Sequence, residues 1–164
     1  MLDSLNLAEA AARARVMATA LALGRSLDRW SLALAALALA GLLWLTLPLT
    51  TSVGLLLSIL AGTGQKVFAL RVAFDAALFD HWAEKWSSDG AEGRDPNALA
   101  TDLMMFDRAL ANCGLATPRG DVVRDLNSRL RGAARLLRRQ VLAVAIQFAA
   151  VAVAMVAVLL SRAG

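Results

Sequence analysis

The residue types most often used in catalysis and metal binding are scarce in this chain and lie far apart. His81 is the single histidine and Cys113 the single cysteine among 164 residues, which excludes an intrachain disulfide and a zinc site built from these residue types. Asp89, Glu92 and Asp95 lie close together, but the alternating acidic positions and closing Glu of a calcium loop are missing. We therefore expect no metal, no cofactor and no enzymatic activity.

One pair of charges suggests a more specific role. Arg71 and Asp75 are four residues apart within residues 66–86, a stretch without Gly or Pro that is typical of a helix, so they can form an ion pair. At membrane depth such a candidate ion pair can line a pathway for ions or protons. The alternative is a pair satisfied within its own helix at the membrane interface, which we favour because two residues do not make a relay.

Two long apolar blocks decide the class of the protein. The chain is 59% hydrophobic and 18% charged, against about 25% charged in soluble proteins. Residues 30–65 hold no charge over 36 residues, and residues 140–161 hold none over 22. Apolar runs of about 18 residues or more are long enough to cross a membrane. The sequence predicts an all-α integral membrane protein.

The first block is too long for one crossing. As a single helix its 36 residues would extend about 54 Å, against a hydrocarbon core of about 30 Å. Pro48 and the following Thr50, Thr51 and Ser52 favour a turn in its middle. We expect a transmembrane hairpin over 30–70 and a third span over 140–161. A second arm that re-enters the membrane or lies on its surface is the alternative.

The distribution of basic residues predicts the orientation of these spans. Sixteen of the 17 Lys and Arg residues, all but Arg162, lie before the hairpin, at its C-terminal end (Lys66), or between it and the last span. Lys and Arg accumulate on the cytoplasmic side of membrane spans. We expect a cytoplasmic N-terminus and a C-terminus outside. The heavy use of Ala, Leu and Arg suggests the inner membrane of a bacterium.

A cluster of arginines precedes the last span directly. At 100° per residue Arg124, Arg131, Arg135 and Arg138 fall within a stripe of about 60°, and Arg139 follows them. Such a stripe can contact anionic lipid head groups. The alternative is a topology signal with a solvated face. Nucleic acid is not an expected partner, because the stripe lacks interleaved aromatic residues.

The remaining segments are expected to be helical and cytoplasmic. Residues 1–29 predict an amphipathic helix on the membrane, because charges flanking its apolar part argue against a cleaved signal. Residues 71–139 predict a small helical cap between spans 2 and 3, in which the apolar stripe of 98–112 needs a partner. The aromatic face of 66–86, with Trp82 and Trp86, is one candidate.

Two features of the spans predict close helix packing. Gly54, Ser58 and Gly62 recur every four residues, a stripe that permits close approach of two backbones. Gln147 lies in an apolar helix, where its amide needs a partner on a neighbouring helix. Both features can serve packing within one chain or between copies of the chain.

Two functions remain compatible with these residues. The first is a non-enzymatic accessory subunit or assembly factor that binds a partner membrane protein. The second is a small homo-oligomeric channel, which needs Lys66, Gln147 and the Arg71–Asp75 pair to face a common lumen. The spans carry almost no polar stripe, so we favour the first. An enzyme acting on lipid is disfavoured, because no acid and base are paired.

Overall fold

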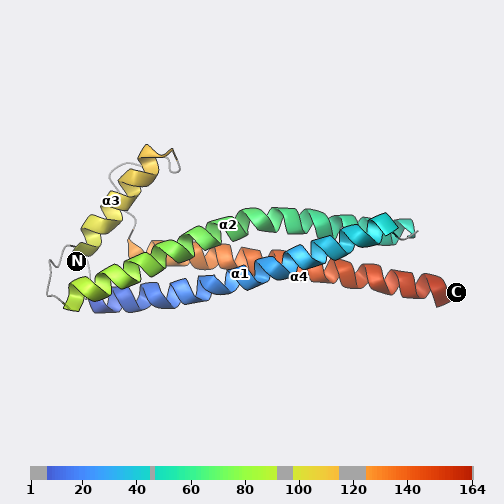
Figure 1. Ribbon diagram of the computed structural model, residues 1–164, viewed down its shortest axis with the longest axis horizontal. Coiled ribbons are helices and arrows are strands. Elements are labelled where there is room, and N and C mark those ends of the chain that lie inside the picture. The colour runs from blue at the N-terminus through green and yellow to red at the C-terminus, as the bar shows by residue number, and fades with distance from the viewer. Residues whose placement is uncertain (1–6, 45–46, 92–97, 115–124, 164) are drawn as a thin grey trace. The chain divides into compact units, whose positions relative to one another are not determined.

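The computed structural model describes residues 7–44, 47–91, 98–114 and 125–163. Within these ranges the secondary structure is helical and consists of α1 (Leu7–Trp44), α2 (Leu49–Ala91), α3 (Ala98–Asn112) and α4 (Leu126–Ala163), as Figure 1 shows. In this described part, α1, α2 and α4 are long and apolar enough to cross a membrane. The all-α class and three apolar helices of membrane-spanning length are therefore confirmed.

The boundaries drawn from the sequence at residues 29 and 70 fall inside helices. α1 continues through the boundary drawn at residue 29, and α2 continues through the boundary drawn at residue 70. Neither helix contains a proline, since the three prolines are Pro48, Pro96 and Pro118, so nothing in either segment blocks the helical hydrogen-bond ladder. The chain instead divides by its internal contacts into two units that cut across these helices.

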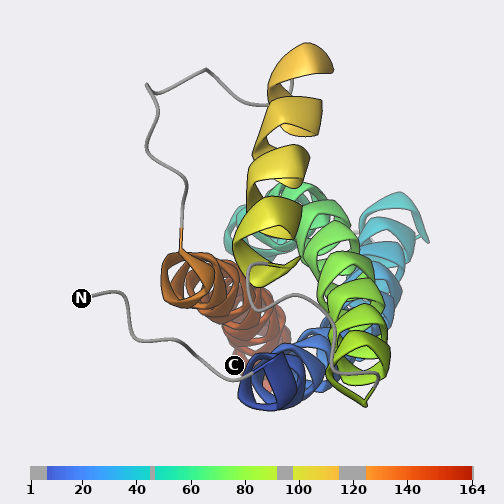
Figure 2. The same cartoon turned by 90° about the vertical axis from the view of Figure 1, so that its left-hand side faces the viewer.

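We name the two units by their content. The apolar unit comprises residues 21–74 and 135–164, and the aromatic unit comprises residues 1–20 and 75–134. α3, the short helix drawn in yellow in Figure 2, belongs to the aromatic unit. Each unit is described separately below.

α2 begins earlier than the sequence suggested. α2 begins at Leu49, directly after Pro48, and the Ser52 amide donates a hydrogen bond of 3.0 Å to the Pro48 carbonyl. The Ser52 hydroxyl donates to the same carbonyl at 3.3 Å. Thr50, Thr51 and Ser52 were expected in the turn, but they form the first turn of α2, because polar side chains can satisfy the free backbone groups of a helix end.

Within the apolar unit, α1 and α4 run in the same direction. Gln140 of α4 hydrogen-bonds to Gly24 of α1, and seven residues further along both helices Gln147 hydrogen-bonds to Ser31. An equal advance of seven residues, or two helical turns, on each helix defines a parallel pair.

α2 runs antiparallel to α4 and lies close to it through its small residues. A Cβ placed on Gly54 would lie 3.3 Å from the Cβ of Ala154, and one placed on Gly62 would lie 2.8 Å from the Gln147 amide nitrogen and 3.5 Å from the Ala35 Cβ. Later residues of α2 therefore contact earlier residues of α4, so the two helices run antiparallel. The stripe that contains these glycines packs within the chain, as the close approach of small residues allows.

The apolar unit has its polar side chains inside and many large aliphatic side chains outside. Ser31, Gln65, Gln140 and Gln147 are buried. The exposed large hydrophobic residues of the same unit include Leu32, Leu37, Leu39, Leu56, Leu57, Leu60, Leu142, Ile146, Leu159 and Leu160. Soluble proteins rarely expose so large an apolar surface. This distribution is consistent with a multi-pass membrane protein.

In the aromatic unit, α4 begins with a well-formed cap. The Asp125 carboxylate accepts a hydrogen bond of 3.2 Å from the Ser128 amide, as an N-cap residue does. A hydrogen bond from the Ser128 side chain, assisted by the charge of Arg131, holds the pKa of Asp125 below its usual value. The helix start expected at Thr117 and Pro118 lies outside the described residues.

The packing of Gly62 yields a prediction. Gly62→Leu should lower the thermal unfolding temperature of the detergent-solubilised protein, because the added side chain collides with the Gln147 amide. Overpacking of this kind costs about 1–3 kcal/mol. Gly64→Leu is the matched control, since a Cβ at Gly64 has no neighbour within 4 Å and the substitution lies on the same helix. Equal unfolding temperatures for the two variants would contradict the packing described.

Candidate functional site

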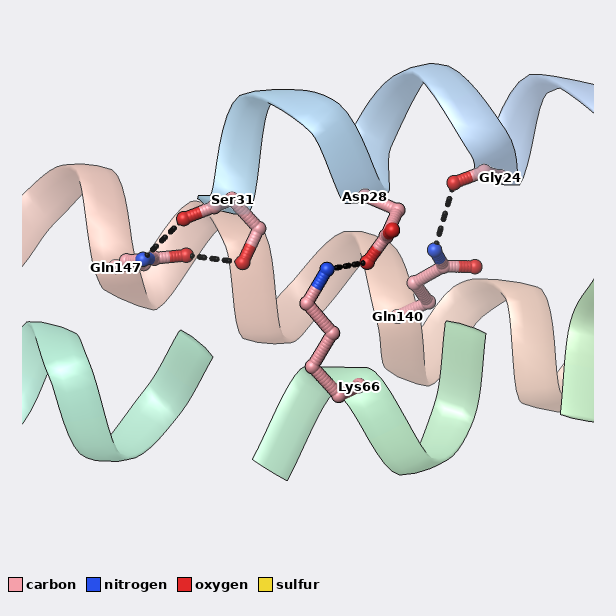
Figure 3. A network of polar contacts seen from close by, with 6 residues as sticks. All are labelled: Gly24, Asp28, Ser31, Lys66, Gln140 and Gln147. Carbon is pink, nitrogen blue, oxygen red and sulfur yellow. Dashed lines mark hydrogen bonds and ion pairs between the residues drawn. The ribbon is translucent and has the colours of Figure 1, made fainter. Parts of the chain in front are cut away.

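A reciprocal pair of hydrogen bonds joins α1 and α4 in the middle of the apolar unit. The Ser31 hydroxyl donates to the Gln147 Oε1 at 2.7 Å, and the Gln147 Nε2 donates to the Ser31 carbonyl at 2.9 Å (Figure 3). Both side chains are fully buried. In an apolar environment, a side chain whose donor and acceptor are both bonded to one neighbour fixes the register of the two helices.

Two further contacts lie closer to the N-terminal ends of α1 and α4. The Gln140 Nε2 donates to the Gly24 carbonyl at 2.8 Å, and Lys66 of α2 forms an ion pair of 2.7 Å with Asp28 of α1 (Figure 3). The ion pair gives Lys66, the first charged residue after the long apolar block, a carboxylate partner on a neighbouring helix. Because both side chains of the ion pair are partly exposed, 43% and 32%, the pair contributes little to stability.

Arginines from all three helices surround this end of the apolar unit. This end of the unit is defined by three residues that lie close together, one on each helix. A Cβ placed on Gly24 of α1 would lie 2.8 Å from Val72 of α2 and 2.8 Å from Gln140 of α4. Within five residues of these positions lie the exposed arginines Arg25, Arg29, Arg71, Arg135, Arg138 and Arg139. Asp28 is the one carboxylate in the described part of this unit, and it is paired with Lys66. We call the six arginines the cationic belt.

The other arginines of the predicted stripe are placed differently. Arg131 belongs to the aromatic unit, is exposed, and donates a hydrogen bond of 3.3 Å to the Ser128 hydroxyl. Arg124 lies outside the described residues. The expected Arg71–Asp75 pair joins one residue of each unit, with Arg71 exposed and Asp75 half-buried, and it stays a prediction.

The aromatic unit is organised around Trp82. This side chain stacks on Trp86 at 5.4 Å between ring centroids, and it contacts Phe79 at 5.7 Å and Phe106 of α3 at 5.3 Å, both edge to face. Trp82 and Trp86 are buried. The apolar stripe of α3 therefore packs on the aromatic face of α2, and such ring pairs contribute about 0.5–1.5 kcal/mol each beyond their burial.

Arg129 of α4 closes this aromatic cluster from one side. Its guanidinium lies 5.6 Å from the centre of Trp82 and 5.3 Å from the centre of Phe106, and it forms an ion pair of 2.6 Å with Asp107. It also donates to the Leu103 carbonyl at 3.4 Å. The side chain of Arg129 is 10% exposed, so these contacts are largely shielded from solvent.

Asp102 attaches α3 to α2 through polar contacts. Its carboxylate accepts a hydrogen bond of 3.0 Å from the Trp86 indole nitrogen and forms an ion pair with Lys85. A buried indole N–H needs such an acceptor. Asp102 and Arg129 thus hold the helices of this unit together.

A shallow apolar hollow of about 300 Å³ lies on the surface of the aromatic unit. Its lining includes Val16, Met17 and Leu130, and the one charged residue at its edge is Arg13. The Arg13 guanidinium is already bound to Glu9 at 2.6 Å. Without a convergent set of polar groups, the hollow offers no arrangement for catalysis.

The described residues contain no group of three or more His, Cys, Asp or Glu side chains placed to hold a metal ion. No family model, no curated protein and no solved structure matches the chain. The observations that bear on function are therefore the two clusters of contacts described above.

Several residues of these clusters were not singled out from the sequence. They are Asp28, Gln140, Gln65, Asp102 and Arg129. For the two glutamines a signal existed, because a polar residue at the edge of an apolar block is costly unless it has a partner. For Arg129 there was none, because its partners are 22 to 47 positions earlier in the chain and it stands among four other arginines.

The position of Arg129 yields the second prediction. Arg129→Lys should lower the unfolding temperature and change the tryptophan fluorescence spectrum, because an ammonium group does not stack on Trp82 and Phe106 as a planar guanidinium does. Arg131→Lys, an exposed residue two positions away on the same helix, is the control. If both variants melt and fluoresce alike, Arg129 does not hold the cluster together.

Proposed function

We propose that the protein is a non-enzymatic accessory subunit or assembly factor of a larger complex in a bacterial inner membrane. The observation that carries this proposal is the use of the polar side chains. In the spans Ser31, Gln147 and Lys66 bond to other helices of the same chain, and in the aromatic unit Asp102 and Arg129 do the same. A chain whose polar groups serve its own packing is suited to hold a partner and not to perform chemistry.

The alternative, a homo-oligomeric channel, has less support. A lumen between copies needs polar groups on the outer surface of the bundle. Gln147, which was a candidate for that surface, is fully buried, and Lys66 is paired with Asp28. The span surface is instead lined by the exposed aliphatic residues of the apolar unit.

α3 provides the surface that we propose for a protein partner. Its face toward the cluster carries Leu103 and Phe106, while Met104 and Met105 are exposed, at 45% and 64%. Methionine is flexible and polarisable, and adjacent exposed methionines are common on surfaces that bind other proteins. The proposed occupant is an apolar segment of the partner membrane protein.

The cationic belt supports a proposed orientation and a lipid partner. Belt arginines gathered at one end of the apolar unit fit the cytoplasmic interface, with the N-terminus in the cytoplasm and the C-terminus outside. The aromatic unit then forms the cytoplasmic cap. Since the single carboxylate of the described apolar unit is paired with Lys66, we propose anionic head groups as counter-charges for the belt arginines of α1 and α4.

The first experiment tests the partner. The tagged protein, extracted at its native level in mild detergent, should migrate as a complex larger than its own mass and carry a stoichiometric second membrane protein. Met104→Ser with Met105→Ser should weaken that association, while Ala100→Ser, an exposed change on the same helix, should not. A clean homo-oligomer without a partner would favour the channel and call for conductance measurements.

The second experiment tests the arginines. Replacing Arg131, Arg135, Arg138 and Arg139 with Gln should place a C-terminal reporter on both sides of the membrane, because the orientation signal before the last span is lost. The milder pair Arg138→Gln and Arg139→Gln should keep its orientation but lose anionic phospholipid from the purified protein, measured by native mass spectrometry. Arg15→Gln, at an exposed residue outside the belt, is the control. Unchanged reporter accessibility and unchanged lipid content would contradict both roles.

A further inference from the structure

The core of the apolar unit contains buried polar atoms that its own residues do not satisfy. In the described part of the chain, five fully buried side-chain atoms have no hydrogen-bond partner in the protein, namely Thr51 Oγ1, Ser58 Oγ, Gln65 Nε2, Gln65 Oε1 and Gln140 Oε1. All five belong to the apolar unit. Gln65 stands out because its entire amide is unpartnered while the residue is 0% exposed.

Neighbouring contacts place the Gln65 amide between two polar layers. On α2, Gln65 lies between Gly62, which packs against Gln147, and Val72, which packs at the level of Gln140. Its level along the bundle is therefore between the levels of those two glutamines of α4. Three of the unpartnered atoms, the Gln65 amide pair and the Gln140 Oε1, fall in this one segment of the bundle.

The free-energy cost of this arrangement is too large for the atoms to remain unbonded. A buried polar atom without a partner loses the hydrogen bonds that it makes in water, and in a bilayer no solvent from the lipid side can compensate. Three such atoms would offset a large part of the small net stability of a folded domain. A hydrogen-bonding ligand in this layer removes the cost.

The three unpartnered atoms of Gln65 and Gln140 restrict the kind of ligand that can bind. They are two acceptor oxygens and one donor nitrogen, so the ligand must both donate and accept hydrogen bonds. A cation can be bound only by the oxygens, and the six arginines of the cationic belt disfavour it further. We propose that ordered water is bound in the core of the apolar unit at the levels of Gln65 and Gln140, here called the Gln65–Gln140 layer, as a structural component of the spanning bundle.

The bound water does not extend into a conduit. Between Thr51 and Ser58 the core is the apolar cluster of Ala38, Leu55 and Ala154, with further aliphatic residues packed against it. Such a cluster stays dry. The Thr51 hydroxyl is thus separated from the Gln65–Gln140 layer, and this inference stands independently of the accessory role proposed above.

The chain supplies its own matched control for a direct test. It contains three glutamines, Gln65, Gln140 and Gln147, and all three are fully buried in the apolar unit. In protein labelled with ¹⁵N only in glutamine side chains and reconstituted in lipid bilayers, each signal can be tested for magnetisation transfer from water. Gln65 should show a cross-peak to water, whereas Gln147, whose amide is bonded to Ser31, should show none.

Variants assign the signals and give the outcomes that overturn the proposal. Gln65→Leu should remove the water cross-peak while the Gln147 signal keeps its chemical shift, which reports that the bundle is still folded. Gln147→Leu assigns the control signal. If Gln65 shows no water transfer, the layer is dry and the proposal is overturned. It is equally overturned if Gln147 shows the same transfer as Gln65, because the bundle then opens generally to solvent.

Discussion

The structure of the spanning helices depends on one constraint, that a polar group in an apolar surrounding must find its partner within the protein. The reciprocal pair of Ser31 and Gln147 meets this constraint completely, because each residue supplies a donor and an acceptor to the other. The pair also sets the register of α1 against α4, since a shift by one residue would leave both buried amide atoms unbonded. Aliphatic contacts alone would not distinguish these registers so sharply.

The small residues of α2 follow from the same constraint. A glutamine between helices needs space, and Gly62 gives it, since a Cβ there would lie 2.8 Å from the Gln147 nitrogen. Spacings of four and three residues recur among the buried and helix-facing positions of α2, which are Thr51, Leu55, Ser58, Gly62 and Gln65. Alternation of this kind is the pattern of left-handed helix packing, in which polar core residues fix register at the expense of stability. The bundle thus combines close backbone contact with a specific alignment.

The sequence was sufficient for the helical class and for the three apolar helices, because block length and the absence of charge are local properties. It was not sufficient for helix limits. Nothing in the segments around residues 29 and 70 distinguishes a helix that ends at a membrane surface from one that continues beyond it. The partners of Gln140 and Gln147 could not be predicted either. Each partner lies 116 positions away in the sequence, and any small residue of the hairpin was an equal candidate. Such contacts are decided by helix direction and register, which composition does not encode.

The two units are stabilised by different physical terms, and this difference bears on function. In the aromatic unit Trp82 and Trp86 are buried, Phe106 is half-buried, and the Arg129 guanidinium, paired with Asp107, lies over the rings of Trp82 and Phe106, so burial of aromatic surface in water is the main driving force. In the apolar unit the outer surface is aliphatic, and specificity comes from a few hydrogen bonds. A substitution on the exposed face of α3 can therefore change the partner contact proposed above without disturbing the bundle. That separation is what an accessory subunit needs, because its binding surface can adapt to a partner while its spanning helices stay the same.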